Sequence, residues 1–572
     1  MRSRRTSLPA VIAVAGGMLS AVAVAGVAVP QAQARSYVSA PSVSAPSVSA
    51  PSVSAPSDDL LYQQNFVGGS VPSSDWISGG SGGTPCLTAG SGGGAIASCG
   101  SSDKDAAGTG VLRLTTNQQN QTGYVLYTHP LKADRGLSIA FDMYQYNTKT
   151  TGGADGIAFI LVNGSASPTK AGDFGGALGY KGLAGGYLGI GFDEWGNFSN
   201  TQIFGKGKGK NGRVPNTIVV RGAESAGYPY LAAKTAAHPL ADDGVHNRDA
   251  ARHHVIIQIS TSGLISVSVS YGKQTVQEIS NLDMSGAGQP ALPPTIKFAI
   301  AASTGANTNT HAISGLTISA LPPDLQMAIS TTGNFQAGGK GMLTATVLDK
   351  ASAGPTTGPT TTVISLPPGL DPSSAQGTGW TCTVKSPQVS CARPDLLQSG
   401  DAFPPITVTS AIASSVPPQV SVTANADSPD SPLASGRASV AIPVAQGPDL
   451  STALTPVGQF QAPGVGTYLL TVANAKSAGV TSSMITETMT VPDSQTATAA
   501  TGNGWQCSIS GQTVTCTTPA VLAAGQSLPP IAVTVQTAAM QLNPTAQVST
   551  ANDAGQPGET APPVSVQVTQ VG

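Results

Sequence analysis

Alternating apolar and polar residues along most of the chain predict β-strands. Five such stretches lie at 111–114, 137–141, 255–260, 265–270 and 296–301. Alternation turns every second side chain toward the same face of a strand, so each stretch can bury one face and expose the other to water. Gly, Pro and Asn residues, which favour turns, separate the stretches. We therefore predict an all-β protein.

The C-terminal part of the chain contains an internal repeat. Pro323 recurs as Pro448, and Trp380 recurs as Trp505, each 125 residues later. Because the offset stays constant, the two copies have no net insertion between them, which indicates tandem domains of one fold. Short alternating stretches between Gly and Pro turns are typical of a β-sandwich. We predict one sandwich at 323–446 and a second at 448–572.

The 6 cysteines of the chain form three pairs that are close in sequence. Two of the pairs have the same spacing in the two repeats and can each bridge the arms of one hairpin, whereas the third brackets a loop rich in Gly and Ser. Sequence-local pairing is the most economical of the many pairings that six cysteines allow. A metal site is not favoured, because no pair has C-x-x-C spacing. The predicted disulfides are Cys86–Cys99, Cys382–Cys391 and Cys507–Cys516.

The N-terminus has the parts of a secretory signal peptide. Three arginines precede an apolar stretch at 8–29, and Ala32-Gln33-Ala34 supplies the small residues of a cleavage site. We predict a signal peptide over 1–34. The alternative is an uncleaved anchor, because the stretch is long enough to span a bilayer, but its Ala-rich composition and the cleavage site favour removal. The export route, general or twin-arginine, stays open.

Residues 35–58 form a linker in which Val-Ser-Ala-Pro-Ser occurs four times from Val38 onward. Such a repeat has no large apolar side chain and is typical of an extended, solvated spacer. The remaining segment, 59–320, is long enough for one large sandwich. We therefore expect three folded domains after the linker.

The charge balance of the chain argues against a nucleic-acid partner. The chain has 27 Lys and Arg residues against 29 Asp and Glu residues, and charged residues make up only 10% of it. Nucleic-acid binding needs an excess of cations to neutralise phosphates, so we expect no nucleic-acid partner. After signal cleavage we expect a secreted protein without a transmembrane anchor, and association with the cell wall stays open.

Four segments between 59 and 320, taken in order, resemble the L-type, legume-lectin-like carbohydrate-binding domain, and in particular its bacterial branch. They are 153–159, 175–180, 186–197 and 302–314. The resemblance implies a concanavalin-like jelly-roll β-sandwich that binds glycans or polysaccharides. The two C-terminal copies resemble the immunoglobulin-like repeats of bacterial surface proteins, which implies spacer or adhesion modules.

The resemblance also implies which residues contact sugar. Asp155, after a cis Ala-Asp peptide, accepts hydrogen bonds from sugar hydroxyls, and Asn197 donates one. Gly176 lets the backbone approach the sugar and offers its N–H. Asn307 lies in the loop that varies with specificity. Trp195 either stacks on a sugar face or is a buried core residue.

The same resemblance implies calcium. Asp193, the carbonyl of Trp195 and Asn197 place three oxygens on alternate residues, and calcium takes about six to eight oxygens. Plant members have a Glu where this chain has Gly191, and a further Asp where it has Gln202. The sequence therefore does not support a transition-metal site, and we expect weak calcium binding. The alternative is that Asp193 closes a turn without a metal.

An enzymatic role is not expected. Similar sandwiches include glycosidases, which need two carboxyl groups about 5–5.5 Å apart. A strand supplies them through the pattern Glu-x-Asp-x-x-Glu, but this chain has Gly191 and Gly196 in place of both glutamates. We predict a secreted, calcium-dependent carbohydrate-binding protein. The alternative is a structural surface adhesin whose lectin-like sandwich mediates protein contacts.

Overall fold

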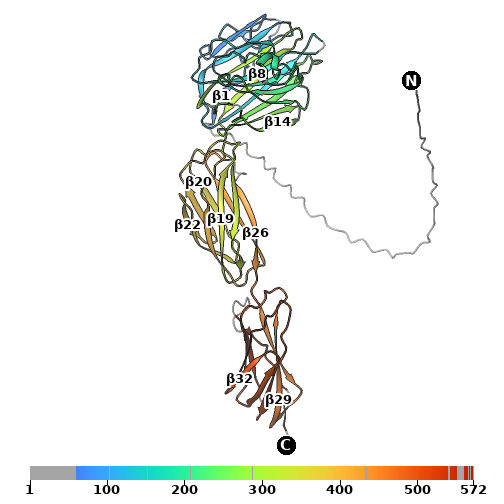
Figure 1. Ribbon diagram of the computed structural model, residues 1–572, viewed down its shortest axis with the longest axis vertical. Helices are drawn as coiled ribbons and strands as arrows, with labels where there is room; N and C mark the ends of the chain where they lie inside the picture. Colours follow the sequence, from blue (N-terminus) through green and yellow to red (C-terminus); the bar gives the residue numbers. More distant parts are fainter. Residues whose placement is uncertain are drawn as a thin grey trace, which may run out of the picture. The chain divides into compact units, whose positions relative to one another are not determined.

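The computed structural model describes residues 59–572, apart from 102–103, 151, 207, 287, 432–435, 539–541, 551–558, 565, 567 and 571–572. The predicted signal peptide and linker lie outside the described residues. Nearly all described secondary structure is β-strand, which confirms the predicted all-β class (Figure 1). In the described ranges, none of the helices combines the length and the apolar character needed to cross a membrane.

The segment 59–320 forms two facing sheets. In spatial order, the first contains β14 (Gln274–Asp283), β13 (Leu264–Tyr271), β12 (Arg252–Ile259), β7 (Leu137–Tyr146), β16 (Thr310–Ser319), β5 (Leu112–Thr115), β3 (Cys86–Leu87) and β4 (Ala97–Ser98), and β1 (Leu60–Gln64) pairs with β16. The second contains β11 (Tyr230–Thr235), β10 (Thr217–Arg221), β9 (Gly186–Asp193), β8 (Gly156–Asn163), β15 (Thr295–Ser303), β6 (Thr122–Lys132) and β2 (Trp76–Ser81). Each of the five predicted strands falls on β5, β7, β12, β13 or β15.

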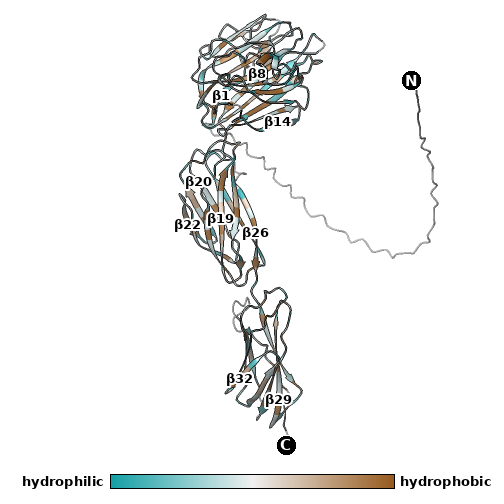
Figure 2. Ribbon diagram, viewed as in Figure 1, coloured by the Kyte–Doolittle hydropathy of each residue, from teal (hydrophilic) through white to brown (hydrophobic). Residues whose placement is uncertain are grey.

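A core of aromatic and aliphatic side chains fills the space between the two sheets. The ring of Phe159 stacks on Phe141 of the opposite sheet with centroids 5.5 Å apart, and on Phe298 of β15 with centroids 5.7 Å apart. Brown, apolar ribbon is concentrated in the strands around β8 (Figure 2). Because stacked rings combine a large buried area with a preferred geometry, this cluster fixes how the sheets face each other.

A second, smaller core covers the outer face of β8, β9 and β15. Tyr180 and Phe198, which lie in the loops after β8 and β9, are fully buried against that face. Strands covered on both faces are expected to be continuously apolar, and seven of the eight residues of β8 are buried. The loops that carry the predicted site are therefore packed onto the sheet.

Arg221, in β10, holds these loops through contacts of its side chain with their backbone. Its guanidinium is fully buried, donates from Nε to the Phe198 carbonyl at 3.0 Å, and donates from Nη1 to the Lys208 carbonyl. It also lies 4.0 Å from the ring centroid of Phe204, which places the cation over an aromatic face. Burial lowers the pKa of Arg221 to about 10. One side chain thus fixes three points of the segment 196–210.

The two C-terminal repeats have the same strand order. In the first, one sheet contains β17 (Leu325–Thr332), β19 (Lys340–Asp349), β24 (Ile406–Ile412) and β21 (Leu370–Gln376), and the other contains β18 (Phe335–Gln336), β26 (Arg437–Ala445), β25 (Gln419–Asp427), β20 (Thr360–Ser365), β23 (Gln388–Arg393) and β22 (Thr381–Lys385). In the second, one sheet contains β27 (Leu450–Val457), β29 (Gly464–Asn474), β34 (Ile531–Thr537) and β31 (Gln495–Gly502). The other, given in the same direction as in the first repeat, contains β36 (Glu559–Thr560), β35 (Thr545–Ser549), β30 (Ile485–Thr490), β33 (Thr513–Thr518) and β32 (Gln506–Ser510). A separate pair is formed by β28 (Phe460–Ala462) and β37 (Val568–Gln570).

The structure contains the three predicted disulfides. Cys382 and Cys391 face each other across β22 and β23, and Cys507 and Cys516 do so across β32 and β33. In both repeats the neighbouring tryptophan donates from Nε1 to a proline carbonyl, at 2.8 Å in the first and 3.0 Å in the second. The equivalent contacts show that the sequence repeat is also a structural repeat.

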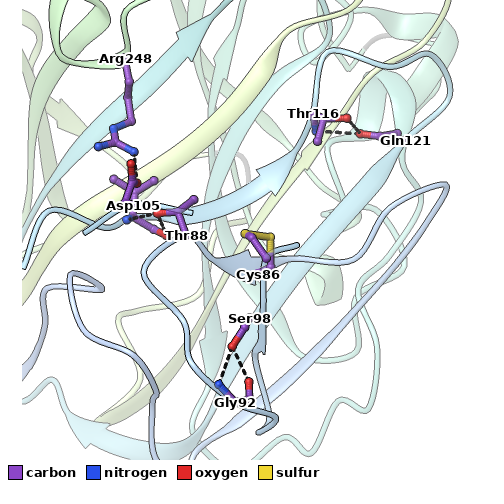
Figure 3. Close-up of a disulfide and its surroundings, with 10 residues drawn as sticks. Cys86, Thr88, Gly92, Ser98, Asp105, Thr116, Gln121 and Arg248 are labelled. Atoms are coloured by element: carbon purple, nitrogen blue, oxygen red, sulfur yellow. Dashed lines mark hydrogen bonds and ion pairs between the residues drawn. A yellow bond between two sulfur atoms is a disulfide. The ribbon is translucent and has the colours of Figure 1, made fainter. Parts of the chain in front are cut away.

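The third disulfide, Cys86–Cys99, joins β3 to the segment after β4 (Figure 3). Beside it, the Ser98 hydroxyl accepts a hydrogen bond of 2.8 Å from the Gly92 N–H. Arg248 forms an ion pair with Asp105, which follows Cys99 in the chain. These contacts order a stretch that would otherwise be costly to fix because of its Gly and Ser content.

Candidate functional site

Four loops meet where β8 begins and β9 and β15 end. The N–H of Asp155 donates to the Ser303 carbonyl at 2.7 Å, and the N–H of Trp195 donates to the Asp155 carbonyl at 3.0 Å. The Ser303 hydroxyl also lies 3.4 Å from the carbonyl of Gly175, the first residue of a short 3-10 helix (Gly175–Ala177). Backbone contacts thus bring the predicted Asp155, Gly176, Trp195 and Asn197 to one edge of the sandwich.

Asp155 follows a cis peptide bond with Ala154, as the resemblance implies, and is 6% exposed. Its Oδ2 accepts a hydrogen bond of 2.8 Å from the Ser303 hydroxyl. Burial raises the pKa of Asp155, and the bond from Ser303 opposes that rise. No described residue donates to Oδ1, which leaves this oxygen as an acceptor for a ligand.

Gly176 lies directly beneath Asn197. A Cβ at position 176 would lie 2.6 Å from the Asn197 Cβ and 3.0 Å from Ile203 Cγ1, so only glycine fits there without displacing these side chains. The Asn197 Oδ1 lies 3.4 Å from Asn200 Nδ2, and Asn197 is half-buried. Its own amide nitrogen is therefore the end of the side chain that is left to donate to a ligand.

Asp193 closes its own turn. It is 1% exposed, and its carboxylate accepts from the Gly196 N–H at 2.8 Å through Oδ1 and from the Phe198 N–H at 2.6 Å through Oδ2. Burial raises its pKa to about 7, and the two hydrogen bonds oppose the rise. Asp193 is one of the three predicted calcium ligands, and both of its carboxylate oxygens already accept backbone hydrogen bonds. The arrangement fits the turn alternative more directly than it fits a calcium ligand.

Trp195 is half-buried and lies outside the hydrophobic cores. The Arg213 guanidinium lies 3.6 Å from its ring centroid, so a cation covers one face of the indole. A sugar could contact only the other face or an edge. The predicted Asn307 donates from Nδ2 to the Gly152 carbonyl at 2.8 Å, which ties the predicted specificity loop to the segment before β8.

The sequence analysis missed a pair of carboxyl groups beside this site. Glu194 and Asp243 are hydrogen-bonded to each other, and the Asn309 amide donates to both, at 3.2 Å to Asp243 Oδ1. Burial and the neighbouring carboxyl group of Asp243 raise the pKa of Glu194 to about 9. Glu194 stands inside the 186–197 motif, but Asp243 comes from a loop without a recognisable motif. Only the fold brings the two together.

A separate pocket of about 680 Å³ lies over one end of β12 and β13. Its lining includes Asp142, Arg252, His253 and Tyr271. His254 Nδ1 lies 2.8 Å from Asp142 Oδ1, so the imidazole and the carboxylate are paired there. None of the predicted sugar-contacting residues lines this pocket.

No protein-family model matches the chain, and no curated protein matches it. Among solved structures, the chain is similar to the VIP36 exoplasmic/lumenal domain in a Ca²⁺/Man3GlcNAc-bound form, with 17% identity, coverage of 44% of this chain and 85% of that chain, and a TM-score of 0.30. It is also similar to peanut lectin in complex with a 9mer peptide (18% identity, 45% and 97% coverage, TM-score 0.30). A third similar structure is lectin II from Ulex europaeus (15% identity, 46% and 99% coverage, TM-score 0.31).

Proposed function

We propose that the chain is a secreted carbohydrate-binding protein that holds a glycan at Asp155, Gly176 and Asn197 without altering it. The observation that carries this proposal is the Oδ1 of Asp155, which accepts no hydrogen bond from a described residue, in a loop that the Trp195 N–H joins to the segment of Asn197. A carboxylate oxygen that accepts and an amide nitrogen that donates can together bind neighbouring sugar hydroxyls. Because Gly176 has no side chain, a sugar ring can approach the backbone at this position.

Binding without catalysis agrees with how the carboxyl groups are placed. Glycosidases hold two carboxyl groups on either side of the bond that they cleave. In this chain Glu194 and Asp243 both accept from the Asn309 amide nitrogen, so they lie together and not on either side of a bond. Asp155 is bonded to Ser303 and has no partner carboxyl group in the described part of the chain at hydrogen-bonding distance.

Calcium dependence is part of the proposal, with Asp193, the Trp195 carbonyl and Asn197 as the predicted ligands. Bound calcium would neutralise charge and stabilise the loops beneath the sugar. The hydrogen bonds from Gly196 and Phe198 to Asp193 already stabilise the same turn, so this ligand set fits the ion only in part.

We propose that the two C-terminal sandwiches are immunoglobulin-like spacers that carry the binding domain, at the cell surface if the protein stays there.

A glycan array tests the proposal. The full chain is applied with added calcium and again with a chelator, together with Asp155→Asn and, as a matched control, Asp283→Asn, because Asp283 is an exposed carboxylate at the end of β14. We expect a related set of glycans to be bound by the parent and by the control, and lost by Asp155→Asn. Binding to cell surfaces that Asp155→Asn leaves unchanged would favour the structural adhesin instead.

A further inference from the structure

Four segments that are far apart in the sequence converge beside the proposed sugar site. Glu194 follows β9, Asp243 lies in the loop before β12, Asn309 precedes β16 and Gly153 precedes β8. The Asn309 amide nitrogen donates to Glu194 Oε2 and to Asp243 Oδ1, and the Gly153 N–H donates to Asp243 Oδ2 at 3.2 Å. Glu194, Asp243 and Asn309 are called the carboxylate cluster below.

The negative charge of the carboxylate cluster is not balanced by the protein. In the ranges that the structure describes, neither Glu194 nor Asp243 forms an ion pair with Lys, Arg or His. Two adjacent carboxyl groups repel each other if both ionise, so without a cation the pair keeps a proton between them. A divalent cation could take the place of that proton and remove the repulsion.

Asn309 provides an independent sign of a missing ligand. The residue is fully buried, and its Oδ1 has no hydrogen-bond partner among the described residues. Buried polar atoms in native proteins are nearly always paired. The two ends of an amide have almost the same shape, so a half-turn of the side chain exchanges Nδ2 for Oδ1. That rotation places a third oxygen against Glu194 and Asp243.

We propose that the carboxylate cluster binds a calcium ion through Glu194, Asp243 and the Oδ1 of Asn309. Oxygen-only ligands suit this hard divalent cation, which would displace the proton that the two carboxyl groups share, and water or a sugar hydroxyl would complete its coordination. The site differs from the predicted Asp193 set, because both Asp193 oxygens face backbone N–H groups. At Gly153, a Cβ would lie 2.0 Å from Asn309 Nδ2 and 2.2 Å from Glu194 Oε1, so only glycine allows this close approach.

The position of the carboxylate cluster links the ion to sugar binding, and this part of the inference rests on the proposed function. Glu194 is covalently joined to Trp195, whose N–H donates to the Asp155 carbonyl. Gly153 stands two residues before Asp155 on the other side. Calcium at the carboxylate cluster would therefore hold both chain segments that position the sugar-binding carboxylate.

Calcium titration of the full chain, followed by calorimetry without any glycan, tests the site. We expect Glu194→Gln and Asp243→Asn each to weaken calcium binding at least tenfold, and Asp283→Asn, at an exposed carboxylate, to leave it within twofold of the parent. Asp193→Asn, measured alongside them, separates this site from the predicted Asp193 set. Terbium, used as a luminescent substitute for calcium, should be sensitised by Trp195 in the parent and much less in Trp195→Phe. Melting curves show that each variant is folded.

Parent-like calcium binding by folded Glu194→Gln and Asp243→Asn would overturn the proposal, as would a loss confined to Asp193→Asn. Absence of calcium binding by the parent would overturn it as well. Because no glycan is present, the outcome is separate from that of the array. A parent that binds calcium through the carboxylate cluster but no glycan would retain this site and contradict the proposed function.

Discussion

Asp349 and Asn474 occupy the same position in the two C-terminal repeats, and each accepts a hydrogen bond of 2.9 Å from the backbone N–H of the residue 25 positions earlier. Their second side-chain atoms differ. Asn474 Nδ2 donates to the Gly479 carbonyl at 2.7 Å and to the Leu522 carbonyl at 3.2 Å, whereas Asp349 Oδ2 is buried and has no partner among the described residues. The first repeat therefore leaves a buried side-chain atom unpaired at a position where the second repeat pairs it.

Asp349→Asn should stabilise the first repeat. The new amide can donate to the carbonyls that match those of Gly479 and Leu522, and it removes a buried carboxyl group whose pKa burial raises to about 7. We expect the free energy of unfolding at pH 8 to rise by about 1–3 kcal/mol. Calorimetric melting of the full chain measures this. The reciprocal variant, Asn474→Asp, should destabilise the second repeat, and stabilisation by both changes would contradict the argument.

Stability of the second repeat should fall as pH rises. Glu487 is 1% exposed, its Oε1 accepts from the Thr452 hydroxyl at 2.7 Å, and burial raises its pKa to about 8. The folded state therefore keeps the proton to higher pH than the unfolded state, whose pKa is about 4.5. Stability is full below about pH 4.5, decreases up to about pH 8 and is constant above it.

Glu487→Gln should abolish this pH dependence, as followed by the melting temperature of the second repeat between pH 4.5 and pH 9. The measurement is made in an Asp349→Asn background, because Asp349 titrates in the same range. Glu487→Thr, which copies Thr362 of the first repeat, serves as a second test. A slope that both variants retain would assign the titration to another group.

Gly176→Ala should weaken glycan binding by tenfold or more while the protein stays folded. The added Cβ would meet the Asn197 Cβ at 2.6 Å and displace the Asn197 side chain. Gly286→Ala is the matched control, since a Cβ there has nothing within 4 Å. Titration with the best glycan from the array compares the two. Equal affinities would show that Asn197 does not contact the sugar.

Arg221→Met should loosen the loops under the site. Loss of the guanidinium leaves the carbonyls of Phe198 and Lys208 without their donor, and we expect a loss of about 2–4 kcal/mol in the free energy of unfolding. Arg437→Met, at an exposed position of β26, is the control. Thermal melting of the full chain checks both, and a parent-like melting temperature for Arg221→Met would show that the aromatic packing suffices.

The strands and the disulfides could be predicted because their signals are local. Alternation within a few residues identified β7 and β13, and the spacing of Cys382 and Cys391 fixed a hairpin. The carboxylate cluster could not be predicted in this way. Asp243 lies far from Glu194 in sequence, and the burial of Asn309 depends on how β16 enters its sheet.

The oxygen spacing from Asp193 to Asn197 suggested a metal because a calcium loop and a carboxylate that closes its own turn share the same residue pattern. The hydrogen bonds from Gly196 and Phe198 establish the turn, and calcium binding at Asp193 stays a prediction. Trp195 shows the same limit. Its sequence context left a sugar platform and a core residue open, whereas the structure places it under Arg213.

The strands β22 and β32 are the outermost strands of their sheets, and each is held to its only sheet neighbour by a disulfide. An edge strand is normally where local unfolding of a sheet begins. It is also where another polypeptide can pair with the exposed backbone or a protease can cleave the chain. With the crosslink in place, this strand cannot peel away from the hairpin even when its hydrogen bonds open. For the secreted protein that we propose, the disulfide would therefore protect the edge of each repeat that is most exposed to proteolysis and to unwanted strand pairing.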